Sequence, residues 1–225
     1  MKRQKRKVTK AIAIVGEGMS EWLYFDYIRT DRRYPFELRP DLPKHSDYRT
    51  VFAHAKKLLS SGYDFVFCVV DVDTIVAQNK QEEFINACHS LDGKLIPITS
   101  NPCIEFWFLL YLWERPLRKY YATYADLLPA LRKYYPDYDK SRDYMQGKQF
   151  FRKLESTGNI NRAMENSEKI LKGDLNPSNF ANRSFSEVST LLKSLEMCSK
   201  CGFKAKCDDC VNKLDTIFQQ PKTRR

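Results

Sequence analysis

Two apolar runs that end in acidic residues constrain the fold of this chain more than any other feature of its sequence. Residues 10–16 lead directly into Glu17, and residues 64–70 lead into Asp71 and Asp73. Apolar side chains stand at nearly every position of both runs, which is typical of a strand that is covered on both faces. The two runs therefore predict neighbouring strands of a mainly parallel sheet with helices on both sides.

The segments around these runs alternate between helical and extended patterns. Helices are predicted to begin at Ser20, which can act as an N-cap, and to cover residues 47–60 and 81–91. Short strands are predicted over residues 36–42 and 94–99. The alternation of strands and helices predicts an α/β layer fold with right-handed crossovers. Because ligands of such sheets bind at the carboxyl ends of the strands, the acidic residues stand where a site is expected.

The chain changes character after residue 100. Residues 104–113 are apolar on nearly all sides and predict a buried helix. The segment from there to about residue 183 reads as helical, basic and rich in tyrosine. Residues 184–187 read Ser-Phe-Ser-Glu, a capping-box pattern that predicts the start of a further helix. The expected parts are a basic tail (1–9), an α/β core (10–113), a helical cap packed on the core (114–196) and a cysteine-rich tail (197–225).

Glu17, Asp71 and Asp73 form the leading candidate site. Alternate side chains of an extended Asp-x-Asp segment share one face, so Asp71 and Asp73 can approach one ion. Glu17, from the neighbouring strand end, can add a third carboxylate or act as a base. Mg²⁺, or Mn²⁺ in its place, suits such a site, because Mg²⁺ prefers oxygen ligands and usually takes one or two carboxylates, water and substrate phosphate. Such a metal polarises a phosphate, offsets charge in the transition state or generates hydroxide.

Each acidic residue also has an interpretation without a metal. Glu17 reads as an exposed turn residue, Asp71 as a helix or turn cap, and Asp73 as a solvated side chain. Glu21 suits the positive end of its helix, and a place near the metal is its second interpretation. Glu105 lies within an aromatic helix, where a buried carboxylate requires a partner. A bond to a backbone turn or a nearby lysine and a place beside the metal are equally open for it.

The net charge of +10 suggests a polyanionic partner such as nucleic acid. Basic residues gather at both termini, and others between Arg115 and Lys153 alternate with a tyrosine cluster over residues 111–144. Cations neutralise phosphates and tyrosine rings stack on unpaired bases. Tails that only add solubility, and a helical cap with solvated cations, would give the same pattern.

A cytoplasmic location without a membrane partner is expected. No apolar run approaches the roughly 18 residues that a membrane span requires, and the basic start lacks the apolar segment of a signal peptide. The odd number of cysteines argues against a disulfide framework in such a protein.

Four of the seven cysteines gather near the C-terminus as two Cys-x-x-Cys pairs. Cys198 and Cys201 form the first pair, and Cys207 and Cys210 form the second. Four thiolates suit a structural Zn²⁺ site. A redox pair or unliganded thiols are the alternatives.

The order and spacing of three motifs give the chain a resemblance to a known family. The motifs are Val-Gly-Glu-Gly-Met-Ser-Glu over residues 15–21, Val-Asp-Val-Asp over residues 70–73 and Ser-Asn-Pro-Cys-Ile-Glu-Phe-Trp over residues 100–107, with a weaker match over residues 182–188. In these motifs the chain resembles the RloB-like proteins, a branch of the TOPRIM-like nucleases associated with bacterial abortive-infection and restriction loci. The resemblance spans residues 8–196 and leaves out the cysteine-rich tail.

This resemblance implies a TOPRIM-like fold and Mg²⁺-dependent cleavage of nucleic acid, either an RNA such as tRNA or DNA. It implies that Glu17 is the acid/base and that Asp71 and Asp73 are metal ligands. It also implies a role in anti-phage defence with an ABC- or AAA-type ATPase encoded nearby as a partner. A homodimer is a further expectation.

The leading hypothesis is therefore a metal-dependent endonuclease, with Glu17, Asp71 and Asp73 at its site and Glu21 and Glu105 as further catalytic candidates. A non-catalytic nucleic-acid-binding or partner-docking module is the first alternative. Nucleotidyl transfer of the TOPRIM type is the second. A transferase would need a pocket for a nucleoside triphosphate, and the sequence has no Gly-rich phosphate loop of known pattern.

Overall fold

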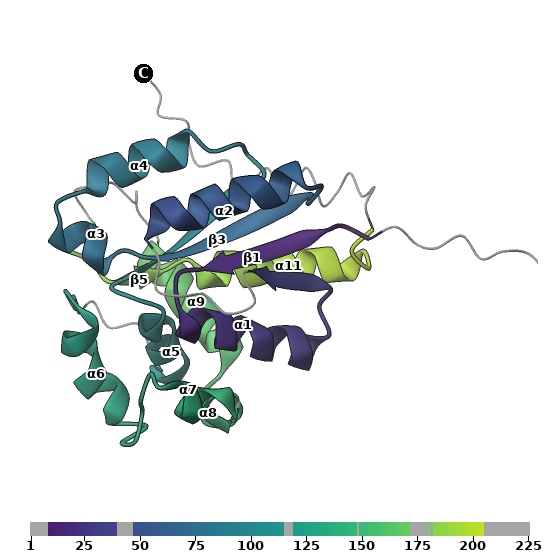
Figure 1. Cartoon of the computed structure of the whole chain (residues 1–225). Coiled ribbons are helices and arrows are strands. Elements are labelled where there is room, and N and C mark those ends of the chain that lie inside the picture. The colour runs from purple at the N-terminus through teal and green to yellow at the C-terminus, as the bar shows by residue number, and fades with distance from the viewer. Residues whose placement is uncertain are drawn as a thin grey trace, which may run out of the picture.

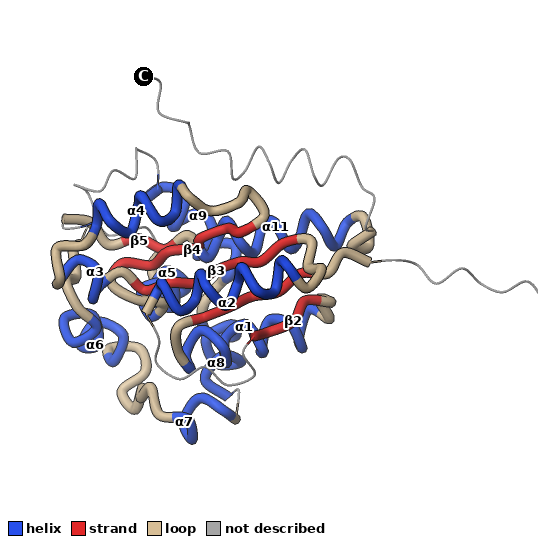
Figure 2. Tube along the Cα trace, turned by 45° about the horizontal axis from the view of Figure 1, so that its top comes forward, coloured by secondary structure: helices blue, strands red, loops and turns tan. Residues whose placement is uncertain are grey.

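A computed structural model describes residues 9–39, 47–114, 119–147, 149–171, 180 and 182–204 of the chain. Its centre is a five-stranded sheet in the order β2-β1-β3-β4-β5. The first four strands are parallel and β5 is antiparallel to β4. Figure 2 shows the strands side by side, with β2 at one edge and β5 at the other. The strands are β1 (Ile12–Gly16), β2 (Phe36–Arg39), β3 (Phe65–Asp71), β4 (Leu95–Asn101) and β5 (Phe185–Ser186).

Helices cover both faces of this sheet (Figure 1), so the predicted α/β layer fold with a mainly parallel sheet is confirmed. On one side lie α2 (Tyr48–Ser60), α3 (Asp73–Ala77) and α4 (Gln81–His89), and on the other lie α1 (Met19–Arg32), α5 (Glu105–Leu112) and α9 (Ile160–Leu171). The remaining helices are α6 (Tyr124–Arg132), α7 (Arg142–Gln146), α8 (Gln149–Thr157) and α11 (Val188–Lys200).

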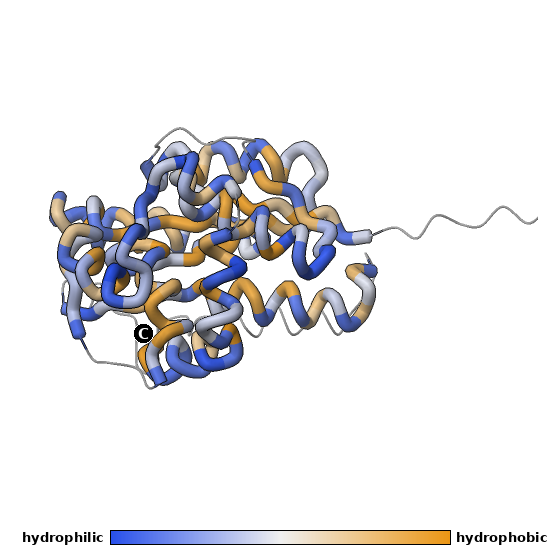
Figure 3. Tube along the Cα trace, turned by 90° about the horizontal axis from the view of Figure 1, so that it is seen from below, coloured by the Kyte–Doolittle hydropathy of each residue, from blue (hydrophilic) through white to orange (hydrophobic). Residues whose placement is uncertain are grey.

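The buried strands and helix α5 form the core, as their continuous apolar runs predict. Every residue of β1 is buried, and so are the first six residues of β3 and the residues of α5 from Glu105 to Tyr111. Figure 3 shows hydrophobic segments in the interior of the fold and hydrophilic ones around them. Burial on both faces removes the alternation that a half-exposed strand would show. Within the described part of the chain, no helix is long and apolar enough to cross a membrane.

Both predicted helix caps are wrong, because a distant partner takes up the side chain in each case. Helix α1 has Gly18 at its N-cap, and the buried Ser20 hydroxyl instead donates to Glu105 at 3.1 Å. In the second pattern, residues 185–186 pair with β4 as strand β5. The carboxylate of Glu187 accepts from the backbone amide of Thr99 at 2.8 Å, so no capping box forms before α11.

Candidate active site

The carboxyl ends of β1 and β3 lie next to each other. Gly16, the last residue of β1, pairs with Val69 in parallel register. Glu17 therefore leaves the sheet beside Asp71, the last residue of β3. The predicted meeting of these two strand ends is confirmed.

The two aspartates are held by backbone amides. Asp71 Oδ1 accepts from the amide of Ile104 at 3.0 Å, just before α5. Asp73 Oδ1 accepts from the amide of Thr74 at 2.6 Å, where Asp73 begins α3. Because α3 starts here, Asp73 turns away from the line of the strand, and the two carboxylates do not stay on one extended face as the sequence pattern predicts.

Of the two glutamates near β1, Glu21 is the more deeply buried. It lies in the first turn of α1, as predicted, but its side chain is only 4% exposed. A Cβ atom at residue 16 would lie 3.1 Å from the Glu21 Cβ, so glycine at that position makes room for the glutamate. Burial raises the pKa of the Glu21 carboxyl group, and the side chain of Asp71 has a smaller, opposite effect. Glu21 Oε2 is buried without a hydrogen-bond partner in the described part of the chain.

Glu105 is fully buried and is bound on several sides. Ser20 Oγ donates to Glu105 Oε1 at 3.1 Å, and the hydroxyl of Tyr138 donates to the same oxygen at 2.9 Å. Lys140 Nζ lies 3.0 Å from Glu105 Oε2. The lysine partner considered from the sequence is therefore present, and it comes from the segment between α6 and α7. The same ammonium lies 4.0 Å from the ring centroid of Tyr124.

The carboxyl groups at this edge raise one another's pKa values. Burial and then the charge of Glu21 raise the pKa of Glu17 from 4.5 to about 9, and a hydrogen bond from the Asp71 backbone opposes this rise. Burial, followed by the charges of Glu21 and Glu105, raises the pKa of Asp71 well above its ordinary value. Burial also raises the pKa of Glu21 and of Asp73. Crowded carboxyl groups in a low-dielectric site cannot all ionise without a cation.

Lys140 is the described cation that acts on this cluster. It lowers the pKa values of Glu21, Asp71 and Asp73, although its effect is smaller than that of burial. Burial lowers the pKa of Lys140, but its neighbours, Glu105 first and then Cys103 and Asp71, together raise that pKa above its ordinary value. Five carboxyl groups thus share this edge, namely Glu17, Glu21, Asp71, Asp73 and Glu105, and Lys140 acts on the last four of them.

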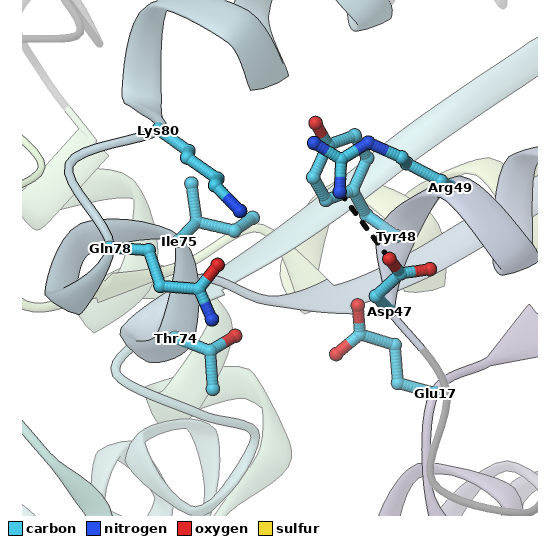
Figure 4. Close-up of a pocket in the computed structure, with 8 residues that line it drawn as sticks. All are labelled: Glu17, Asp47, Tyr48, Arg49, Thr74, Ile75, Gln78 and Lys80. Atoms are coloured by element: carbon cyan, nitrogen blue, oxygen red, sulfur yellow. Dashed lines mark hydrogen bonds and ion pairs between the residues drawn. The ribbon is translucent and has the colours of Figure 1, made fainter.

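A pocket of about 160 Å³ opens beside Glu17 (Figure 4). Its wall also contains Asp47, Tyr48 and Arg49 from the start of α2, and Thr74, Ile75, Gln78 and Lys80 from α3 and the turn that follows it. Arg49 and Asp47 form an ion pair at 3.4 Å, which Figure 4 marks with a dashed line. Of the five carboxylates, Glu17 is the one that lines this pocket.

The carboxylates do not form a preassembled metal site. Among the described residues, no group of three or more His, Cys, Asp or Glu side chains is arranged to hold a metal ion together. Any ion at this edge would therefore rely on fewer protein ligands, which is usual for Mg²⁺. The unpartnered oxygen of Glu21 and the unbalanced charge around Asp71 are what such an ion would satisfy.

Residues 12–195 match a family model described as RloB-like protein. The chain belongs to the RloB-like family. The matched range contains all five carboxylates, Lys140 and the pocket residues of this RloB-like chain. No curated protein and no solved structure matched the chain.

The cysteine-rich tail follows the RloB-like match. Cys198 lies in the last turn of α11, and Cys201 is its C-cap residue. Cys201 Sγ lies 3.1 Å from the backbone oxygen of Cys198, so the first Cys-x-x-Cys pair occupies one turn. Cys207 and Cys210 lie outside the described residues, and the Zn²⁺ site stays a prediction.

Sequence reasoning missed Lys140 and the pocket residues of this RloB-like chain. Lys140 was one of many basic residues in the tyrosine-rich segment, and nothing in its local pattern marks it as the partner of Glu105. Thr74, Gln78 and Lys80 follow Asp73 directly in sequence. That proximity to the Asp-x-Asp motif was the one signal that could have found them.

Proposed function

We propose that this RloB-like chain is a divalent-metal-dependent nuclease that hydrolyses phosphodiester bonds at the joined ends of β1 and β3. The observation that carries the proposal is a cluster of five buried or partly buried carboxyl groups there, beside which Lys140, paired with Glu105, is the described cation. Burying a carboxylate without a partner is costly. Such an arrangement is therefore retained where a bound cation balances the charge in the working state, and clusters with perturbed pKa values are typical of active sites.

The residues present fit Mg²⁺ or Mn²⁺. Asp71 and Asp73 would hold the ion, with Glu17 or Glu21 as a further oxygen donor, and water and a substrate phosphate would complete its coordination. The bound metal would polarise the phosphate and offset the negative charge that develops during hydrolysis. Two carboxylate ligands suffice for this ion, so a third from Glu17 or Glu21 is not required.

Glu17 is the proposed acid/base. It lines the pocket, whereas Glu21 and Glu105 are buried and do not line it. A pKa raised to about 9 lets the metal-free carboxyl group hold a proton at neutral pH. General acid–base groups work best when their pKa lies near the working pH. A bound cation would lower that pKa toward neutrality and let Glu17 accept or donate a proton during the reaction.

Glu105 and Lys140 are proposed as positioning residues. Glu105 joins α5 to Ser20 of α1 and to Tyr138, and Lys140 neutralises it. This network holds the first turn of α1, which carries Glu21, against the start of α5, whose preceding amide holds Asp71. The proposed role of this network is to hold the carboxyl groups of Glu21 and Asp71 in place.

Nucleic acid is the proposed substrate. The net charge of +10 favours a polyanion. The exposed large hydrophobic side chains of the described residues are Tyr120, which is 37% exposed, and Tyr134, which is 46% exposed, and both can stack on unpaired bases. The pocket beside Glu17, at about 160 Å³, is below the roughly 300–1,000 Å³ of sites that enclose a drug-sized ligand, which disfavours a nucleoside triphosphate and nucleotidyl transfer.

Family membership extends the proposal to a TOPRIM-like fold and to anti-phage defence with an ATPase partner. These parts rest on the resemblance of the motifs that carry Glu17, Asp71 and Glu105. An assay therefore needs a control with the ATPase added, because a partner ATPase can be required for turnover.

The test is incubation with tRNA, single-stranded RNA and plasmid DNA, each with Mg²⁺, Mn²⁺ or EDTA, with and without an ATPase encoded nearby. The wild-type chain is expected to cut at least one substrate with a divalent ion and none in EDTA. Glu17→Gln and the Asp71→Asn/Asp73→Asn double variant are expected to be inactive. Cleavage that persists in both variants would refute the site, and binding without cleavage under every condition would favour a non-catalytic binding module.

A further inference from the structure

The pocket beside Glu17 has a second wall that the proposed hydrolysis does not use. Thr74, Gln78 and Lys80 line this wall, opposite Glu17 and Asp47 (Figure 4). They offer a hydroxyl, an amide and an ammonium group, which are hydrogen-bond donors to an anion.

Lys80 is the cation of this pocket that forms no ion pair or hydrogen bond with the described residues, although its charge helps to lower the pKa of Glu83. Arg49 is bound to Asp47 at 3.4 Å and also to Glu83. Glu83 accepts from the hydroxyl of Tyr48 as well, at 3.2 Å. Within the described part of the chain, no ion pair or hydrogen bond ties up the Lys80 ammonium, which is therefore available to a ligand.

The backbone fixes Lys80 relative to the carboxylates. The amide of Lys80 donates to the carbonyl of Ile75 at 2.9 Å, and the amide of Gln78 donates to that of Thr74 at 3.1 Å. Asn79 between them adopts a left-handed conformation with φ of 54°, which asparagine tolerates better than most residues. This turn follows α3, which begins at Asp73, so the pocket wall is continuous in sequence with a candidate metal ligand.

The size of the pocket selects the ligand. A volume of about 160 Å³ has room for a phosphate and part of its sugar, but it is well below the roughly 300 Å³ at which whole-ligand sites begin. We propose that Lys80, with Thr74 and Gln78, binds a backbone phosphate of the nucleic-acid strand next to the phosphate on which Glu17 acts. This subsite rests on the proposed function, and its role is to set the register of the strand at the carboxylates.

The test measures binding rather than cleavage, so that the two proposals can fail separately. Fluorescently labelled single-stranded RNA and DNA of equal length are titrated in EDTA at several salt concentrations, with wild-type, Lys80→Gln, Lys80→Arg and Lys94→Gln chains. Lys94 is the matched control, because it is exposed and precedes β4 at the opposite end of the sheet.

Losing one phosphate contact should reduce the slope of log K against log salt concentration by about 0.7 for a single strand. We expect this reduction in Lys80→Gln and the wild-type slope in Lys80→Arg and Lys94→Gln. The same reduction in slope with RNA and with DNA would identify the shared backbone phosphate as the ligand. A reduction with only one of the two would identify that nucleic acid as the source of the phosphate.

Equal slopes for Lys80→Gln and Lys94→Gln, or no binding by the wild-type chain, would overturn the subsite. Failure of the wild-type chain to cleave would overturn the nuclease proposal alone. Where cleavage occurs, Lys80→Gln should raise KM and leave kcat near the wild-type value, whereas a purely structural defect would lower kcat as well.

Discussion

The two ends of the parallel strands use polar groups in opposite ways. At the amino ends, Asp64 Oδ2 accepts from the amide of Ala11 at 2.8 Å, and the amide of Lys10 donates to the carbonyl of Phe203 at 2.7 Å. At the carboxyl ends, Glu21 and Asp71 share a site in which one buried oxygen has no partner. Polar groups at the amino ends are therefore hydrogen-bonded, whereas the carboxyl ends bring several carboxyl groups together without enough partners.

This difference distinguishes the carboxyl ends of the parallel strands from their amino ends. A protein that breaks the rules of polar pairing usually does so at functional positions. Both ends belong to the same strands and are set by the same register, so the fold alone does not explain the difference. The proposed cation explains it, because it would supply the positive charge that Lys140 alone does not.

The largest expected effect is the loss of cleavage rate when a carboxylate is removed at the carboxyl ends of the strands. Glu17→Gln should lower kcat by about 10²- to 10⁴-fold, the usual contribution of a general acid or base. Asp64→Asn, at the paired end, should cleave near the wild-type rate. Initial rates with the best substrate of the cleavage assay measure both. A similar loss in the two variants would contradict the contrast between the ends.

Removing the ammonium of Lys140 should reduce stability by a smaller amount. Lys140→Met leaves the buried oxygen of Glu105 without its ion-pair partner, which should lower the free energy of unfolding by about 1–3 kcal/mol. The double variant with Glu105→Gln should recover part of that loss. Urea denaturation of the two single variants and the double variant gives the coupling between the residues, and additive losses would show that the pair does not interact.

The pH dependence of stability should reveal the raised pKa values at the carboxyl ends. The pKa of Glu17 rises from 4.5 to about 9 on folding, so between these values the folded chain holds a proton that the unfolded chain has released. Its contribution to stability is complete below about pH 4.5 and is lost as the pH rises to about 9. The metal-free chain should therefore lose stability over this range, by at most about 1.4 kcal/mol per pH unit for each such proton.

The matched variants for this measurement are Glu17→Gln and Glu82→Gln. Glutamine stays neutral, so Glu17→Gln should flatten the decline of stability with pH. Glu82→Gln, at an exposed position in the first turn of α4, is the control that should keep the wild-type decline. Urea midpoints in EDTA at several pH values give the slopes. A wild-type chain whose stability rises with pH would contradict the raised pKa.

The sequence predicts the strands and the meeting of Glu17 with Asp71, because continuous apolar runs fix strand positions and parallel strands align their ends. The burial of Glu21 could not be predicted in this way. It depends on the close approach of Gly16, which is a feature of packing. The structure thus shows that Glu21, already a candidate from the sequence, is buried beside the candidate site.

Contacts between segments far apart in the chain account for the other differences. Ser20 has the composition of a cap, but Glu105 lies close enough to take its hydroxyl group. The segment before α11 looks like a capping box, but the free edge of β4 captures it as strand β5. Lys80 stands out only when α2 and α3 enclose a pocket. Local patterns contain no information about such partners.

The central claim is that the carboxyl ends of β1 and β3 bind a divalent cation. Calorimetric titration of the metal-free chain with Mn²⁺ tests it most directly, with Asp71→Asn as the site variant and Asp64→Asn as the control at the paired end. Wild type and Asp64→Asn should bind Mn²⁺ alike, and Asp71→Asn should lose more than the roughly tenfold to hundredfold affinity that is lost when a residue only orients a ligand. Equal Mn²⁺ affinity in wild type and Asp71→Asn, or no binding by either, would contradict this claim.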